Sequence, residues 1–277
     1  MKAKMIKAAK GLAGSLEYSF MPWNYAADEL LVLCMHSTPK RFMASFEHII
    51  QFLLRKFKPL QPSDLEAYFR GNMKDGPYLL FSFDDGLKNN LEAASMLSKY
   101  NMAALFFVVP DFISAIKPEQ YYREHIRQHI EPWFVNGPED LTPMSIADLK
   151  SLIADGHEIG SHTMTHLLRA SHTELAEQRE IEDSRKWLEE KLQKPVRTFC
   201  SPINTNLSIS RNGKRLIKEH YTYHFSTFPA ENHISKNPLL IFRRNIEVDW
   251  SMGGIKFALG KKDLKRWKEE IQNFINL

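Results

Sequence analysis

Two adjacent carboxylates, Asp84 and Asp85, follow directly after an apolar run at 78–83 and come just before Gly86. A short apolar run of this kind predicts a buried strand, and the glycine allows the backbone to turn sharply after it. Two acids carried to the end of a buried strand are costly to bury unless a cation lies beside them. The stretch is therefore either an ordinary Asp-Asp-Gly turn or the acidic part of a catalytic site.

The histidines offer partners for these acids, because two imidazoles four residues apart can share a metal ion. Three pairs have this spacing: His125 with His129, His162 with His166, and His220 with His224. The first pair falls in a charged stretch that is expected to be an exposed helix, and the third straddles the start of a predicted strand. The second follows directly after a predicted strand, beside Gly160 and small hydroxyl residues that leave room for an ion. Context therefore favours His162 and His166.

One carboxylate and two histidines form a three-ligand set that leaves a coordination position for water, as in catalytic rather than structural zinc sites. A metal in such a site lowers the pKa of bound water to about 7 and polarises a substrate carbonyl. The second carboxylate is then placed to take the proton from that water. The two aspartates with His162 and His166 therefore predict hydrolysis of an amide or ester.

A sheet would have to position these residues, because apolar runs alternate with helical patterns along the chain. The predicted strands span 30–35, 78–83, 103–109, 157–161, 196–201, 222–226 and 239–246. Continuous apolar strands of this kind are typical of a parallel sheet covered by helices. No glycine-rich phosphate loop follows the first strand, which argues against a dinucleotide-binding fold. Polar candidate residues at the C-terminal ends of several strands favour an α/β barrel of the TIM-like kind.

We expect one catalytic domain at 29–277, preceded by a leader segment at 1–28 and closed by an amphipathic helix at 264–275. An insertion at about 111–141 interrupts the alternation and is longer than an ordinary connection. Its aromatic residues are Tyr121, Tyr122, Trp133 and Phe134. Long insertions are often lids over binding sites, and the alternative is that these aromatic rings cover a small core of the insertion itself.

Composition and charge limit the function classes. The net charge of +4 is mild and spread along the chain, so it gives no argument for nucleic acid as a partner. Only Cys34 and Cys200 are present, which makes no disulfide framework and suits a reducing compartment. The leader is rich in lysine, but its apolar residues are too scattered for a signal peptide. We expect a cytoplasmic protein whose basic leader either packs on the domain or touches the inner membrane surface; the oligomeric state stays open.

The segment Phe81–Gly86, followed by Gly160–His166, resembles the linked motifs of the polysaccharide deacetylase family, also called the NodB homology domain or carbohydrate esterase family 4. The resemblance covers roughly 29–250 and includes Ala104–Val109 and Phe199–Pro202. It implies a distorted (β/α)7 barrel in a single domain and a divalent metal, usually zinc. The implied roles are metal ligation by Asp85, His162 and His166, and general-base catalysis by Asp84. The family removes N-acetyl, or sometimes O-acetyl, groups from sugar residues of polysaccharides.

The third family motif departs from the usual pattern. It normally reads Arg-Pro-Pro-Tyr-Gly, whereas this chain has Cys-Ser-Pro-Ile-Asn at 200–204. By the resemblance, Pro202 and Asn204 would contact the substrate, but the arginine that steadies the catalytic aspartate is missing from its usual place. Arg243 or Arg244 in the last predicted strand could supply that charge from another direction. The alternative is that both arginines are surface cations near a strand end.

The family's Leu-x-His motif, which carries the general acid, is absent near the C-terminal end. In a permuted subgroup the corresponding strand comes first in the chain, and Leu33–His36 resembles that strand. The resemblance therefore implies His36 as the general acid and His224 as the second candidate, with a neutral capping histidine as the alternative for either. Trp250 follows Asp249 as in the family's Asp-Trp motif, and it would either wall the acetyl pocket or belong to the core.

These features together predict a metal-dependent hydrolase, with zinc as the expected ion, that removes N-acetyl or other acyl groups from a sugar. The sugar residue would belong to a polysaccharide, a glycolipid or a sugar precursor. Lipid-linked and nucleotide-linked sugars are included because a cytoplasmic enzyme can reach them. The alternative is a carbohydrate-binding relative whose activity was lost with its third motif.

Overall fold

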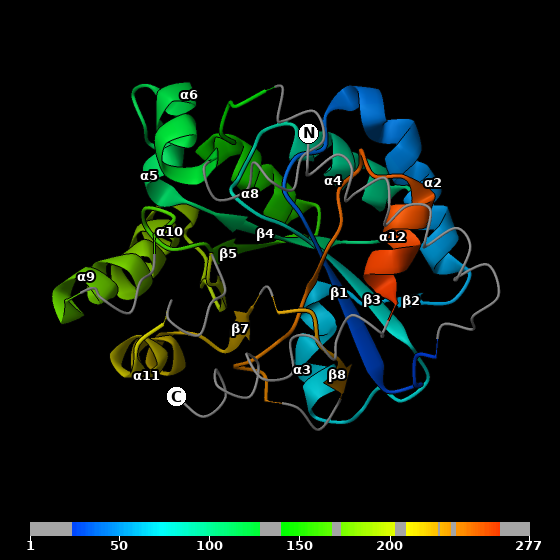
Figure 1. The fold of residues 1–277 in the computed structure, drawn as a ribbon. Coiled ribbons are helices and arrows are strands. Elements are labelled where there is room, and N and C mark those ends of the chain that lie inside the picture. The colour runs from blue at the N-terminus through cyan, green and yellow to red at the C-terminus, as the bar shows by residue number, and fades with distance from the viewer. Residues whose placement is uncertain are drawn as a thin grey trace.

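A curled parallel sheet lies at the centre of the molecule (Figure 1). The computed structural model describes residues 24–127, 140–167, 173–202, 209–226, 228–233 and 237–260. Nearly all of the predicted leader, most of the second half of the insertion and the predicted helix at 264–275 lie outside the described residues. The sheet has the order β7-β6-β5-β4-β3-β1, and each neighbouring pair in that series is parallel. The prediction of a parallel α/β sheet is confirmed.

The strands coincide closely with the predicted apolar runs. They are β1 (Glu29–Met35), β3 (Tyr78–Phe83), β4 (Ala104–Val108), β5 (Glu158–Ser161), β6 (Thr198–Cys200) and β7 (Tyr223–Phe225). Two strands of two residues each, β2 (Lys58–Pro59) and β8 (Asn232–His233), were not predicted, because so short a segment carries no pattern. β2 pairs in parallel with β3, and β8 pairs antiparallel with β1.

The segment predicted as a strand at 239–246 joins the two edges of the sheet. Ile241 forms a parallel bridge with Phe225 of β7, and Arg244 of β9 (Arg244–Asn245) pairs in parallel with Leu33 of β1. Regular strand is limited to two residues, because the amide of Phe242 donates to the side chain of Asn232 instead of to a neighbouring strand. The curled sheet with this closing segment agrees with the predicted distorted (β/α)7 barrel.

Alternate residues of each strand face the inside of this barrel, as the pleat of a strand requires. The inner cluster includes Leu30, Val32, Tyr78, Leu80, Leu105, Phe107, Phe225 and Ile241. The rings of Phe107 and Phe225 lie 5.2 Å apart between centroids although their strands are not neighbours, so both point across the interior. The intervening residues, such as Leu31 and Phe81, pack outward against the helices.

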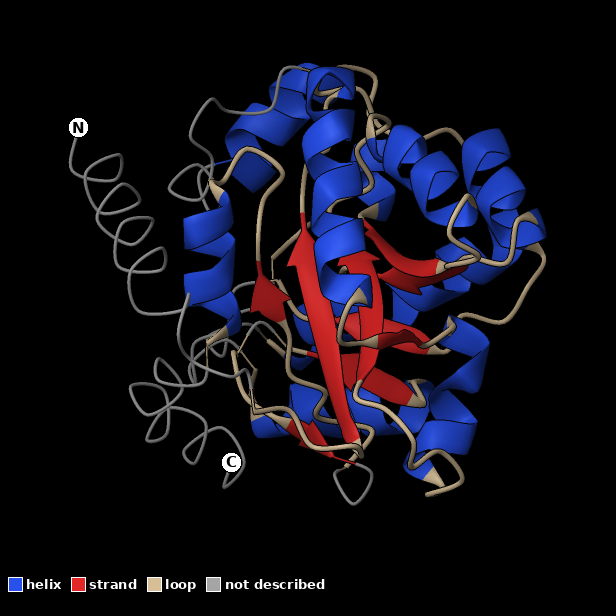
Figure 2. Cartoon of the chain, turned by 90° about the vertical axis from the view of Figure 1, so that its right-hand side faces the viewer, coloured by secondary structure: helices blue, strands red, loops and turns tan. Residues whose placement is uncertain are grey.

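Helices surround the strands (Figure 2). The main ones are α2 (Met43–Leu54), α4 (Asn90–Ser98), α8 (Ile146–Ala154), α10 (Ser184–Leu192), α11 (Arg211–His220) and α12 (Met252–Leu259), with a short α3 at Leu65–Phe69. Ser145 caps α8 by accepting from the amide of Asp148, and Thr173 caps α9 (Glu174–Gln178) by accepting from Ala176. A π-helical stretch, Arg179–Asp183, joins α9 to α10.

The described part of the insertion consists of α5 (Pro110–Ile113), α6 (Pro118–Tyr121) and a π-helical turn, Tyr122–Ile126. It has its own small apolar core, formed by Leu87, Val109, Phe112, Tyr122, Ile126 and Leu141. Of the two possibilities for its aromatic residues, Tyr122 therefore belongs to a core, whereas Trp133 and Phe134 lie outside the described residues. Within the described ranges, no helix combines the length and apolar character needed to cross a membrane.

Candidate active site

The inward-facing positions of the strands become polar at their C-terminal ends. At this end of the barrel lie five polar side chains: Ser82 in β3 and Asp84 directly after it, Cys34 in β1 and His36 directly after it, and Arg243 in the closing segment. All five side chains are buried. The alternation that builds the apolar core therefore also aims the polar residues at one point, because parallel strands end at the same edge of the barrel.

Asp84 and Arg243 form a bidentate ion pair. Arg243 Nη1 donates to Asp84 Oδ1 at 2.7 Å, and Nη2 donates to Oδ2 at 2.8 Å. The guanidinium also donates to Ser82 Oγ at 3.0 Å and to the Ser226 carbonyl at 3.1 Å. Burial alone would raise the pKa of Asp84, but the charge of Arg243 holds that pKa well below its usual value. Asp84 is therefore ionised and fixed in orientation.

Asp84 thus has an arginine partner from another strand, and of the two candidates, Arg243 and Arg244, it is Arg243 that pairs with it. Arg244 points to the end of α12, where it donates to the carbonyls of Ala258 and Gly260. Arg243 Nη2 also donates to Cys200 Sγ at 2.7 Å. Cys200 occupies the place where the motif usually has arginine, and its side chain contacts a guanidinium that comes from another segment.

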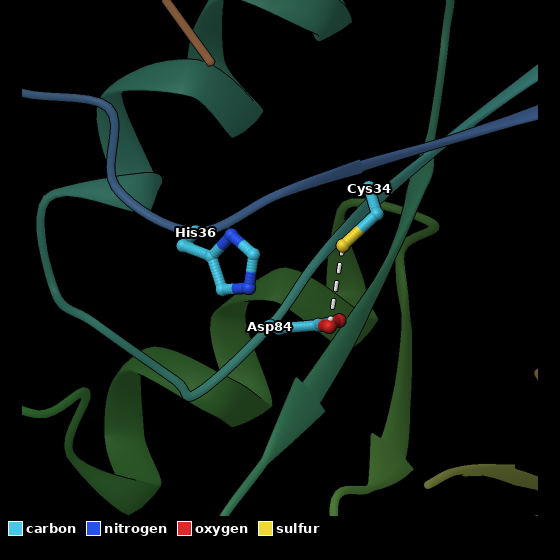
Figure 3. Close-up of side chains that lie close together, drawn as sticks. All are labelled: Cys34, His36 and Asp84. Atoms are coloured by element: carbon cyan, nitrogen blue, oxygen red, sulfur yellow. Dashed lines mark hydrogen bonds between the residues drawn. The ribbon is translucent and has the colours of Figure 1, made fainter. Parts of the chain in front are cut away.

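Cys34 is the second thiol beside Asp84. Its Sγ donates to Asp84 Oδ2 at 3.3 Å, and His36 lies beside the same carboxylate (Figure 3). Burial raises the pKa of the Cys34 thiol and of the Cys200 thiol well above the usual value, so both are protonated. No role was predicted for Cys34 from the sequence, although its place on the inward face of β1 follows from the alternation with Val32.

Asp85, His162 and His166 form a compact set of donors. Their ligand atoms all lie within 4.8 Å of one another, and all three side chains are buried. Asp85 Oδ1 is 3.7 Å from His162 Nε2 and 3.4 Å from His166 Nε2. This oxygen accepts no hydrogen bond from any residue that the structure describes. A buried carboxylate oxygen aimed between two imidazole nitrogens fits a divalent cation held by three protein ligands.

The protonation of these ligands agrees with a metal site. His162 Nδ1 lies 2.8 Å from the Cys200 carbonyl, which fixes the proton on Nδ1 and leaves a lone pair on Nε2. Burial lowers the pKa of His162 to about 4, so the ring is neutral. Burial raises the pKa of Asp85 to about 7, so a cation beside it is needed to keep it fully ionised at neutral pH.

The backbone around the ligands is unusual. Asp85, Thr163 and His166 have positive φ angles of 73°, 64° and 67°, in the left-handed region that non-glycine residues rarely adopt. Such residues persist only where the surrounding structure holds them, and they cluster at functional sites. Gly86, with φ 83°, takes the position after Asp85 that the sequence reserves for a sharp turn.

His36 is paired with Glu247, which was not predicted from the sequence. His36 Nδ1 lies 2.7 Å from Glu247 Oε1, and the His36 amide donates to Glu247 Oε2 at 3.3 Å. Burial alone would lower the pKa of His36, but the charge of Glu247 and its hydrogen bond raise that pKa to about 9. His36 is therefore a cation at neutral pH. Glu247 lies four residues on from the inward-facing Arg243, so it shares that face of the extended segment. This alternation is the sequence pattern that could have indicated Glu247.

The other histidines that were considered as candidates and that the structure describes are not members of this cluster. His224 Nε2 lies 3.1 Å from Ser201 Oγ and its Nδ1 3.2 Å from the Leu239 carbonyl, and burial lowers its pKa to about 4. His224 is thus a neutral buried histidine. His220 lies near Glu182, with Nε2 3.7 Å from a carboxylate oxygen, and His125 is exposed. His129 lies outside the described residues.

The predicted substrate-binding residues have different surroundings. Pro202 is buried at the end of β6, and Asn204 lies outside the described residues. Trp250 is half-buried and packs against the larger apolar cluster between the strands and the helices. The insertion contributes a residue that no pattern indicated: Tyr122 Oη donates to Asp85 Oδ2 at 3.3 Å. A tyrosine among charges in an irregular segment carries no sequence signal of such a contact.

Comparisons with known proteins agree with this geometry. The deacetylase domain of BpsB from Bordetella bronchiseptica has 15% identity and a TM-score of 0.63, covering 82% of this chain and 98% of that chain. The deacetylase PplD from Streptococcus pyogenes has 14% identity and a TM-score of 0.62, with 83% and 98% covered. IcaB from Ammonifex degensii has 19% identity and a TM-score of 0.59, with 84% and 98% covered. At these identities the likeness establishes the fold.

The sequence itself supplies the family. No curated protein matches the chain. The family model described as polysaccharide deacetylase matches residues 71–223, which is more than half of the chain and includes both motifs that carry the aspartates and the histidines. The chain belongs to the polysaccharide deacetylase family.

Proposed function

We propose that the protein is a divalent-metal-dependent hydrolase that removes N-acetyl groups from sugar residues. The observation that carries the proposal is the meeting of three groups in one buried cluster. The three-donor set of Asp85, His162 and His166 lies next to an ionised carboxylate, with His162 Nε2 3.7 Å from Asp84 Oδ2. A cationic histidine, His36, lies close to the same carboxylate (Figure 3). Amide hydrolysis needs these three components: an electrophile, a base and an acid.

Asp85, His162 and His166 would hold the metal, for which we propose zinc because of the mixed nitrogen and oxygen donors. When bound, the ion supplies activation of water and polarisation of the acetamide carbonyl. Asp84 accepts the proton that water loses as it attacks. Arg243 keeps this carboxylate ionised and prevents it from rotating toward the ligands, since both of its oxygens are engaged.

His36 completes the proton balance. The sugar nitrogen is a poor leaving group as an anion, so it must receive a proton as the carbon–nitrogen bond breaks. His36 carries that proton, and Glu247 orients the ring and stabilises its charge. The products are acetate, with the oxygen of water, and a free amine on the sugar. Each of the two proton transfers is thus assigned to one residue of the described site, and the second proton of water leaves with acetic acid, which ionises to acetate.

The proposal also includes the identity of the acyl group that is removed and its attachment to a sugar. The PplD structure with the same fold is a complex with acetate, which favours acetyl as the group removed. The alternative, a sugar-binding relative without activity, depended on the arginine missing from the third motif. The pairing of Arg243 with Asp84 weakens that alternative, because the charge is present although its strand has changed.

Acetate and formate release from a panel of N-acylated sugars tests the proposal. The panel includes polymers, lipid-linked sugars and nucleotide-linked sugars, and the protein is assayed with added zinc and after chelation. We expect acetate release that chelation abolishes and that zinc restores.

His162→Ala removes one of three ligands and is expected to lose both zinc and activity. Zinc bound at one equivalent without any acyl release would favour the sugar-binding alternative.

Glu247→Gln is expected to shift the alkaline limb of the pH–rate profile. The pKa of His36 is raised to about 9, so the acid form is present below that pH and is lost as the pH rises through it. Without the charge of Glu247, burial lowers the pKa of His36, and the limb moves to lower pH. The measurement is kcat from pH 6 to 10 for both proteins. An unchanged alkaline limb would remove His36 from the role of general acid.

A further inference from the structure

The insertion contacts both of the loops that carry the metal ligands. Tyr122 Oη donates to Asp85 Oδ2 at 3.3 Å, next to the oxygen that faces the histidines. The preceding residue, Tyr121, donates its hydroxyl to the Thr165 carbonyl at 3.1 Å, one residue before His166. Adjacent tyrosines of one short segment thus reach the aspartate turn and the histidine loop.

Backbone hydrogen bonds tie the insertion to the same two places. The amide of Asp111 donates to the Met164 carbonyl at 3.0 Å, in the histidine loop. Just after the insertion, the amide of Met144 donates to the carbonyl of Gly86, the residue that follows the aspartates, at 2.9 Å. The amide of Lys88 donates to the Thr142 carbonyl at 2.8 Å. The insertion is therefore fixed to the site at its beginning, along its helical part and at its end.

Packing fixes the position of the Tyr122 hydroxyl. Its ring is completely buried and lies 5.3 Å from the ring of Phe112 between centroids. Tyr122 also opens the π-helical turn Tyr122–Ile126, a rare geometry that is frequent at functional sites. Because the ring cannot move without disturbing the small core, Asp85 Oδ2 has a donor at a set position and Oδ1 remains for the cation.

We propose that Tyr122 is a positioning residue that sets the orientation of Asp85, and that the insertion holds the ligand set in its geometry. This rests on the proposed metal site. The positive φ angles of Asp85 and His166 persist only where the surrounding structure holds them. Tyr122 contacts Asp85 itself, and Tyr121 contacts Thr165, the residue before His166. Mutation of a residue that hydrogen-bonds to a metal ligand typically lowers the affinity for the metal by about 10–100-fold.

Tyr122→Phe tests the proposal, because it keeps the ring and removes only the hydroxyl. Zinc affinity is measured by competition with a chromophoric chelator, and the visible spectrum of the Co²⁺-loaded protein reports the ligand geometry. We expect about a 10–100-fold loss of zinc affinity and an altered Co²⁺ spectrum. Tyr68→Phe is the matched control, since Tyr68 is equally buried and donates its hydroxyl to the Asp28 carbonyl. It should leave both readouts unchanged.

Equal zinc affinity and an identical Co²⁺ spectrum in Tyr122→Phe and the wild type would overturn the proposal. If Tyr122→Phe does not fold, Tyr121→Phe takes its place, because that ring is only partly buried. Unchanged affinity and spectrum in Tyr121→Phe would then overturn it. Failure of the wild type to bind zinc or Co²⁺ at all is a different result, which would overturn the proposed function as well.

Discussion

Asp84→Asn is expected to reduce kcat by about 10²–10⁴-fold, the usual contribution of a general base, while the metal remains bound. The amide oxygen of asparagine still accepts from Arg243, but asparagine cannot take a proton from water. The three proposed ligands are untouched, so zinc content should stay at the wild-type level. Acetate release and metal content are measured on the same preparation.

His162→Ala is the comparison variant, because it should lose metal and activity together, whereas Asp84→Asn should lose activity alone. Asp84→Asn also leaves the charge of Arg243 buried without its carboxylate, so the variant is assayed well below its unfolding temperature. Full activity of Asp84→Asn with zinc bound would exclude Asp84 as the base. Loss of zinc from Asp84→Asn would instead assign Asp84 to the ligand set.

Arg243→Met is expected to lower the free energy of unfolding by about 3–5 kcal/mol, because it leaves the carboxylate of Asp84 buried and unpaired. The contribution of Asp84 to the pH dependence of this free energy is also expected to change sign. In the wild type the depressed pKa of Asp84 contributes stability above the unfolded value near 4, and this is lost as the pH falls through the folded pKa. Without Arg243, burial raises the pKa of Asp84, so stability should fall as the pH rises from 4 toward 7.

Urea unfolding at several pH values measures both effects. Arg244→Met is the matched control, since Arg244 is the next residue, is also buried and donates to the carbonyls of Ala258 and Gly260. It should lose stability without the new dependence on pH. A loss in Arg243→Met that is the same at pH 4 and pH 7 would contradict the assignment of the Asp84 charge to Arg243.

The sequence was sufficient to predict the strands and to indicate that the proposed ligand residues meet in space, for definite physical reasons. The apolar runs of β1, β3 and β4 are long enough to show that both faces are buried, and their order predicted a parallel sheet. The two motifs place Asp84, Asp85, His162 and His166 directly after strands, where the parallel arrangement brings them together. Because the third motif lacks its arginine, Arg243 and Arg244 were both candidates for that charge, and the choice between them needed the structure.

Other parts of the site could not be predicted, because they depend on contacts between distant segments. Glu247 is an ordinary acid near the end of a strand until closure of the sheet brings it to His36. Tyr122 becomes a neighbour of Asp85 only through the small core of the insertion. The match to the family covers 71–223, so His36, Arg243 and Glu247 all lie beyond it.

The pairing of β1 with β9 also determines when the site becomes complete during synthesis. His36 and Glu247 are 211 residues apart in the chain, and Asp84 and Arg243 are 159 apart. A nascent chain that has emerged from the ribosome only as far as β7 already contains the proposed metal ligands. It still lacks the guanidinium that neutralises Asp84 and the carboxylate that charges His36. Such a chain should capture metal before it can turn over substrate, so catalytic competence is gained in one late step of synthesis.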